Sequence, residues 1–156
     1  KVLSSITAID VQDCTEKHIP REDIDFSYRG TNLPSSLIIT AVTLKGTVAD
    51  KQLIEKKQLQ MLEQKKISQP SQIKTCGSTF KNLNNEKKAW QLIKETGCDE
   101  FKVGDAGISK KHCNFFVNHG KANSADIEKL INKVKHTVSK KTGVNLDLEI
   151  KIIGEK

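Results

Sequence analysis

The segment from Thr75 to Asn82, with the sequence TCGSTFKN, combines a glycine, hydroxyl side chains, a cation and an amide without a run of apolar residues. Its glycine allows a tight turn that would present the hydroxyl of Ser78. Three interpretations fit this pattern: a phosphate cradle, the turn of a nucleophile, or an ordinary polar loop. Lys81 follows as a possible partner for an anion. The surrounding sequence is needed to discriminate between these three interpretations.

Two further polar residues could take part in chemistry. Among the 26 basic residues only Arg21 and Arg29 are arginines, and Arg29 lies between Tyr28 and a glycine. A planar guanidinium suits a carboxylate or phosphate, so Arg29 is the better candidate. Glu149 lies on the polar side of an alternating segment near the end of the chain. A surface ion pair and a solvated carboxylate are the ordinary alternatives for these two residues.

The composition indicates a globular protein with one core or two small ones, since 36% of 156 residues are hydrophobic. No stretch approaches the roughly 20 apolar residues of a membrane span, and the first ten residues do not form a secretory signal. The cysteines include no C-x-x-C pair, which argues against a disulfide framework and against a metal site; they are Cys14, Cys76, Cys98 and Cys113. We therefore expect a cytoplasmic protein without a metal.

The formal charge of +7 and pI near 9.2 favour an anionic partner. Lysines are spread along almost the whole chain, aromatic residues are few, and no helix-turn-helix or zinc-finger motif is present. A lysine-rich solvated surface explains the charge, so we do not expect a nucleic acid partner. A nucleotide diphosphate as an anionic ligand would also suit the positive charge of the chain.

The pattern of apolar residues predicts alternating strands and helices. We expect strands at 4–11, 37–44, 113–118 and 144–153, and a glycine-punctuated segment at 102–109. We expect a helix at 50–66 that is ended by Pro70 and a helix at 86–96 that is closed by Gly97. A third helix should begin at Ser124, with Asn123 or Ser124 as its cap, and end at Gly143. The apolar run LIITAVTL at 37–44 predicts a strand buried on both faces.

Four stretches occur in the order and spacing of a known family. They are YRGTNLPSSLIITAVTLKG, QPSQIKTCGSTFKN, ISKKHCNFFVNHGKANSADIEKLINKV and GVNLDLEIKIIG. Together they resemble UDP-N-acetylenolpyruvoylglucosamine reductases, FAD- and NADPH-dependent oxidoreductases that make the muramic acid precursor of bacterial peptidoglycan. The resemblance runs from about Tyr28 to Gly154 and fits the compact subtype of the family.

The resemblance implies an α+β fold in three parts. Residues 1–46 would be the end of the FAD-binding domain, residues 47–149 a small α/β substrate-binding domain, and residues 150–156 a strand that returns to the first domain. The flavin-binding loops of the family are not found, so we expect an N-terminal FAD-binding region to be missing. By itself the chain would bind FAD poorly and be an inactive fragment.

The resemblance also assigns chemical roles. NADPH reduces FAD, and the hydride then goes to the enolpyruvyl group of UDP-N-acetylglucosamine enolpyruvate, leaving a carbon that must be protonated. Ser78 matches the serine that gives this proton, Arg29 the arginine that stabilises the intermediate, and Glu149 the glutamate that assists at the substrate carboxylate. Substrate-binding positions are matched by Tyr28, Gln69, Lys81 and Asn82.

Several positions add detail or depart from the family. His112, Asn114 and Asn118 match a further motif and are expected to hold loops around the pocket. Leu83 replaces the usual proline after Asn82, and lysines stand near the place of a common arginine before Gln69. The alternative to an enzyme is a catalytically inactive basic module of the same fold that contacts anionic ligands or nucleic acid.

Overall fold

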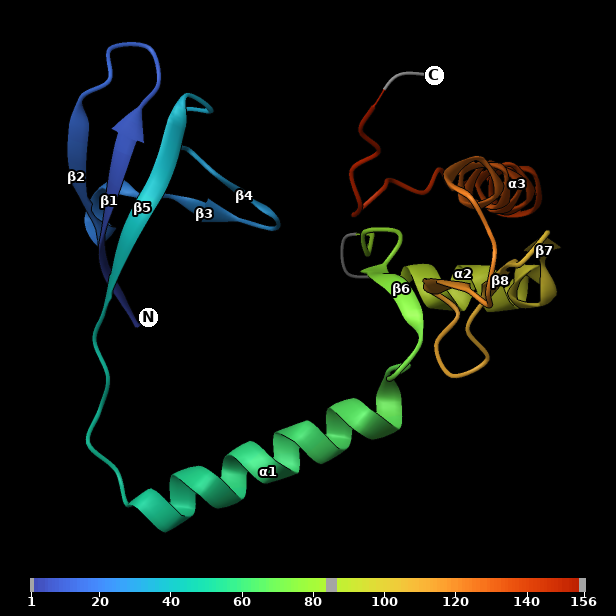
Figure 1. The fold of residues 1–156 in the computed structure, drawn as a ribbon, viewed down its shortest axis with the longest axis horizontal. Helices are drawn as coiled ribbons and strands as arrows, with labels where there is room; N and C mark the ends of the chain where they lie inside the picture. Colours follow the sequence, from blue (N-terminus) through green and yellow to red (C-terminus); the bar gives the residue numbers. More distant parts are fainter. Residues whose placement is uncertain (1, 84–86, 155–156) are drawn as a thin grey trace. The chain divides into compact units, whose positions relative to one another are not determined.

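The computed structural model describes residues 2–83 and 87–154 and shows an α+β fold, which confirms the predicted class. The chain divides into two compact units, Lys1–Ile54 and Glu55–Lys156. The three-part domain assignment from the sequence stays a prediction. Figure 1 shows the order of the elements, from the blue strands of the first unit to the orange helix of the second.

The first unit is an antiparallel sheet in the order β2-β1-β5, formed by β1 (Leu3–Asp10), β2 (Glu16–Pro20) and β5 (Leu37–Leu44). Between β2 and β5 lie a short 3-10 helix, Arg21–Asp23, and a hairpin of β3 (Phe26–Ser27) and β4 (Gly30–Thr31). The β-branched residues of β1 and β5 account for the strands that the sequence predicts. Both strands lie where they were expected.

The predicted burial of β5 on both faces is wrong. More than half of each of four apolar residues on this strand is exposed, namely Ile38, Ile39, Val42 and Leu44. The physical reason is that the described residues form no second layer that covers these side chains on the faces of the sheet; β5 is also at the end of the sheet order and pairs only with β1 among them. Apolar content alone therefore predicted the strand but not what covers it.

α1 (Lys51–Ser68) joins the two units and ends just before Pro70, as predicted. Its expected apolar stripe is not buried, because none of its residues is buried in this chain. Charged and amide side chains surround the helix, and the leucines do not gather on one face.

The second unit is a four-stranded antiparallel sheet in the order β6-β9-β8-β7. Its strands are β6 (Lys74–Ser78), β7 (Lys102–Val103), β8 (Ala106–Ile108) and β9 (Phe115–Asn118). α2 (Ala89–Glu95), a 3-10 turn (Cys98–Glu100) and α3 (Ser124–Thr142) supply the helical side of the core. The core includes Phe80, Leu92, Ile93, Ile108, Phe116, Leu130, Ile131, Val134, Val138 and Leu146.

α3 follows the sequence prediction closely. Asn123 caps its start by accepting a hydrogen bond from the Asp126 amide at 2.9 Å, and Asp126 accepts one from the Asn123 amide at 3.1 Å. Gly143 ends the helix with φ at 74°, a left-handed conformation that favours glycine. The predicted helix at 86–96 is α2, and its expected first residue, Glu86, lies outside the described residues.

The predicted strand at 144–153 is wrong as a regular strand, since only Leu148 forms a bridge, with Phe80. Among the described residues, the backbone of this segment bonds across to Thr79 and Lys81, through the Glu149 amide and the Asp147 carbonyl. The expected alternation nevertheless holds: Leu146 is buried and Leu148 packs against the core, while Asp147 between them is exposed.

Candidate functional site

Ser78 ends β6 and pairs with Phe115 on β9. The register of this pairing shifts between Thr75 and Ser78, and Gly77 within that irregularity has φ at 87°. Such a bulge re-aims the following side chain, and only glycine adopts this φ easily. Ser78 is half-buried. The glycine-led presentation of a hydroxyl that the sequence suggested is therefore built as a bulge in a strand rather than as a free loop.

The residues after Ser78 run between β9 on one side and the C-terminal segment on the other. Thr79 donates from its amide to the Asn114 carbonyl at 2.7 Å and accepts from the Glu149 amide at 2.9 Å. Lys81 donates to the Asp147 carbonyl at 2.8 Å. These bonds place Glu149 beside the residue that follows Ser78. The structure thus brings two of the sequence-predicted site residues, Ser78 and Glu149, into one place.

Glu149 is half-buried at this position, and Thr79 is fully buried. The Thr79 hydroxyl has no hydrogen-bond partner among the described residues. The surroundings of Glu149 differ from the solvated strand position that was its ordinary interpretation.

Tyr28 and Arg29 form the turn between β3 and β4 in the first unit. The Arg29 guanidinium lies 5.1 Å from the centre of the Tyr28 ring, within the range of a cation-π contact. Arg29 has φ at 60°, which is uncommon for a residue with a side chain. Because the turn belongs to the other unit, its role in a site with Ser78 stays a prediction.

The predicted substrate-binding residues of the second unit lie at the ends of elements. Lys81 is half-buried, while Asn82 is exposed and its side-chain oxygen accepts from the Ala89 amide at 3.2 Å, at the first residue of α2. Gln69 follows α1 and borders, with Pro70, a hollow of about 130 Å³. The binding of substrate by Lys81, Asn82 and Gln69 stays a prediction.

Asn114 and Asn118 on and beside β9 hold backbone segments, and sequence reasoning gave them no specific partners. The Asn114 side chain accepts from the Phe80 amide at 2.9 Å and donates to the Phe80 carbonyl at 2.8 Å. Asn118 accepts from the amides of Gly120 and Ala122 at 2.9 and 3.1 Å and donates to the Ala122 carbonyl at 2.8 Å. The Asn114 bonds join segments 34 residues apart, whereas the Asn118 bonds stay within four residues.

His112 packs edge-on against Phe115 and Trp90, with ring centres 4.8 and 6.5 Å away. Burial lowers the pKa of His112 below its ordinary value of 6.5, and its Nδ1 accepts from the Asn114 amide at 3.2 Å. Burial likewise raises the pKa of the Cys113 thiol. A neutral ring with one nitrogen engaged is suited to support of the chain rather than to proton transfer.

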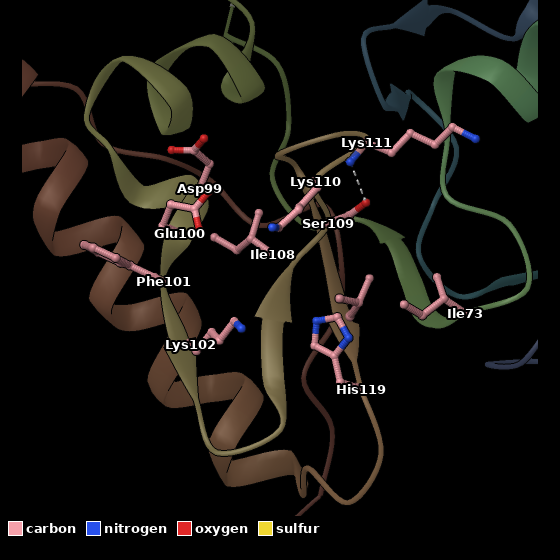
Figure 2. A pocket seen from close by; sticks show the side chains of 11 residues that line it. Ile73, Asp99, Glu100, Phe101, Lys102, Ile108, Ser109, Lys110, Lys111 and His119 are labelled. Atoms are coloured by element: carbon pink, nitrogen blue, oxygen red, sulfur yellow. Dashed lines mark hydrogen bonds between the residues drawn. The ribbon is translucent and has the colours of Figure 1, made fainter.

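A separate pocket of about 320 Å³ lies on the second unit and includes Val117 and His119 (Figure 2). Lys102, Lys110 and Lys111 line it, but so do Asp99 and Glu100. In Figure 2 the Lys111 side chain extends away from the middle of the pocket, and its ammonium group bonds to the Lys66 carbonyl. The mixed charge of this lining does not single out an anionic ligand, and Ser78 is not part of it.

Residues 2–83 and 87–154 contain neither a membrane-spanning helix nor a cluster of metal ligands. None of the helices there has the length and apolarity required to cross a bilayer. Nor do three or more histidine, cysteine or acidic side chains gather there in a group that could hold a metal ion.

Comparisons with known proteins give the family. Residues 69–153 match the model of the UDP-N-acetylenolpyruvoylglucosamine reductase C-terminal domain. The chain belongs to the UDP-N-acetylenolpyruvoylglucosamine reductase family. It is 45% identical to the reductase of Pelagibacter ubique over 97% of this chain, and 39% identical to that of Wolbachia pipientis wMel over 98%. These matches confirm the family resemblance seen in the sequence.

A solved reductase has the same fold. The crystal structure of UDP-N-acetylenolpyruvylglucosamine reductase from Thermus caldophilus matches with a TM-score of 0.80 and 31% identity, covering 96% of this chain and 52% of that chain. The Pelagibacter and Wolbachia reductases are covered over 51% and 52% of their lengths. The chain therefore spans about half the length of the relatives it matches.

The first unit does not fit the pyrophosphate of FAD. Its glycines, Gly30 and Gly46, have no left-handed φ, and neither directly precedes a helix. A dinucleotide cofactor is usually held by a glycine turn whose amides point at the pyrophosphate from a helix start. FAD and NADPH remain family-based predictions for this chain.

Proposed function

We propose that the chain is the substrate-binding half of a reductase acting on UDP-N-acetylglucosamine enolpyruvate, in which Ser78 gives the final proton. Family membership supports this, and the observation that carries it is the pairing of Thr79 with Glu149. The bond joins Thr79, the residue after the one matched to the proton donor, to the residue matched to the carboxylate partner. In the family, reduced FAD supplies a hydride to the enolpyruvyl group.

The proposed work of the chain begins once the terminal methylene carbon has gained that hydride. Negative charge then develops on the neighbouring carbon and its carboxylate. Ser78 breaks its O–H bond to form the new C–H bond at that carbon, and water restores the serine proton. Glu149 shares a proton with the substrate carboxylate, and Arg29 stabilises the negative charge that develops on the substrate. Lys81 and Asn82 contact the diphosphate.

The test joins this chain to the N-terminal half of the Pelagibacter reductase and compares the parent with Ser78→Ala. NADPH should reduce the flavin of both proteins at the same rate, because that step needs no proton from Ser78. Reoxidation by the UDP-sugar should be slowed about 100- to 10,000-fold in the variant, the usual cost of losing a general acid. Stopped-flow absorbance of the flavin follows both steps separately.

Ser71→Ala is the matched control, because Ser71 is an exposed serine shortly before β6. It should leave both half-reactions unchanged. Reoxidation of Ser78→Ala at the parent rate would assign the proton to another group. A parent without any reductase activity would instead favour the inactive basic module.

A further inference from the structure

The three residues from Thr79 to Lys81 are the only backbone link between β9 and the C-terminal segment among the described hydrogen bonds. Asn114, the residue before β9, reaches this link with its main chain and its side chain, contacting Thr79 and Phe80. From the opposite side come the amide of Glu149 and the carbonyl of Asp147. The register of Ser78 against Glu149 therefore depends on how this short link is held.

The Asn114 side chain imitates a strand neighbour. Its oxygen accepts the Phe80 N–H and its NH₂ group donates to the Phe80 C=O, so both polar groups of one residue are satisfied by one amide. Asn114 is 3% exposed and both bonds are buried, where an unmade bond is costly. A carboxylate has the same shape but can only accept, and so could not satisfy the Phe80 carbonyl.

The Phe80 ring adds a second constraint. It is almost fully buried and packs edge-on against Phe116, with ring centres 5.7 Å apart. The ring alone fixes where Phe80 lies, but it does not fix the rotation of the peptide groups on either side. The Asn114 amide sets that rotation, and the carbonyl of Thr79 then meets the Glu149 amide.

From these contacts we infer that Asn114 is the positioning residue of the proton-donating site, setting Ser78 and Glu149 at their working separation. The inference rests on the proposed function. Asn114 acts through Thr79 and Phe80 and does not touch the substrate. Its amide is required because it must accept and donate at once.

Asn114→Asp tests the inference in the joined protein. Its carboxylate would face the Phe80 carbonyl, so at pH 8 the substrate-dependent reoxidation of flavin should slow about 10- to 100-fold, the scale of a small misplacement of reacting groups. Lowering the pH should restore the rate, since a protonated carboxyl group can donate to the Phe80 carbonyl.

Asn118→Asp is the matched control. Asn118 ends β9, and its side-chain amide also accepts and donates, but its bonds go to Gly120 and Ala122 and are part-buried or exposed. Asn118→Asp should lower stability less than Asn114→Asp, and it should leave reoxidation within about twofold of the parent and without recovery at low pH. Asn114→Leu, which buries no charge, should slow reoxidation without any recovery.

Amide hydrogen exchange in the chain itself provides a readout without activity. Asn114→Leu, which removes the acceptor of the Phe80 amide, should reduce protection at Phe80 and Glu149, whereas Asn118→Leu should reduce it at Ala122. Equal reoxidation rates for the Asn114 and Asn118 variants would overturn the inference, and so would unchanged protection at Phe80. A parent without reductase activity would overturn the proposed function and, with it, the role of Asn114.

Discussion

Leu146 offers a sharp test of whether the irregular C-terminal segment belongs to the folded core. It is 1% exposed and part of the core of the second unit, although no regular strand contains it. Leu146→Ala removes three buried carbon atoms, which corresponds to about 2 kcal/mol of lost transfer free energy. Incomplete closure of the remaining cavity adds about 1 kcal/mol, so we expect the free energy of unfolding to fall by about 3 kcal/mol.

Trp90 allows this change to be measured in the correct unit. It is the one tryptophan of the chain, and it packs against the same core from α2. Urea titration followed by its fluorescence should show a midpoint lower by roughly 1.5–3 M, given a slope of about 1–2 kcal/mol per M for a unit of this size. Leu59→Ala is the control, because Leu59 is 66% exposed on α1 and should change stability by under about 0.5 kcal/mol.

A Leu146→Ala midpoint equal to that of Leu59→Ala would refute this placement. It would mean that the segment after α3 detaches without cost and that the bond between Glu149 and Thr79 is not part of the stable fold. The proximity of Ser78 and Glu149 would then lose its physical basis.

Two further predictions use local features of the second unit. Burial lowers the pKa of His112, so as the pH falls below 6.5 the unfolded state binds the histidine proton before the folded state does, and the free energy of unfolding should decline. The urea midpoint followed by Trp90 fluorescence at pH 7.5 and at pH 5.5 measures this decline. His112→Gln should reduce the difference between the two midpoints. Asn123→Ala should cost α3 about 1 kcal/mol by removing the cap on Asp126, measured in the same titration, whereas Asn132→Ala at an exposed helical position should be nearly neutral.

The parts of the fold that depend on local sequence were predictable. Asn123, Gly143 and the spacing of apolar residues between them define α3 without help from the rest of the chain. Exposure was harder, because the apolar run of β5 indicates a strand but not the number of its neighbours. The C-terminal segment alternates like a strand, yet it forms a single described bridge, between Leu148 and Phe80.

The site shows the same division. Local patterns singled out Ser78 and Glu149 as candidates but left ordinary polar roles open for both, and only the family resemblance gave them chemical roles. Their proximity depends on hydrogen bonds between segments about 70 residues apart in sequence, for which a single sequence carries no signal. The specific bonds of Asn114 could not be predicted either, because asparagine in an apolar strand is compatible with many partners.

The exposure of α1 has a consequence for how the chain melts. A helix without a buried face gains nothing from tertiary packing, and an 18-residue helix in water is then only marginally stable. Its residues should lose helicity gradually on heating, while α2 and α3 melt together with the core that they cover. Far-ultraviolet circular dichroism of the whole chain would thus mix a broad helix-to-coil change with a cooperative transition, and a single melting temperature would describe neither.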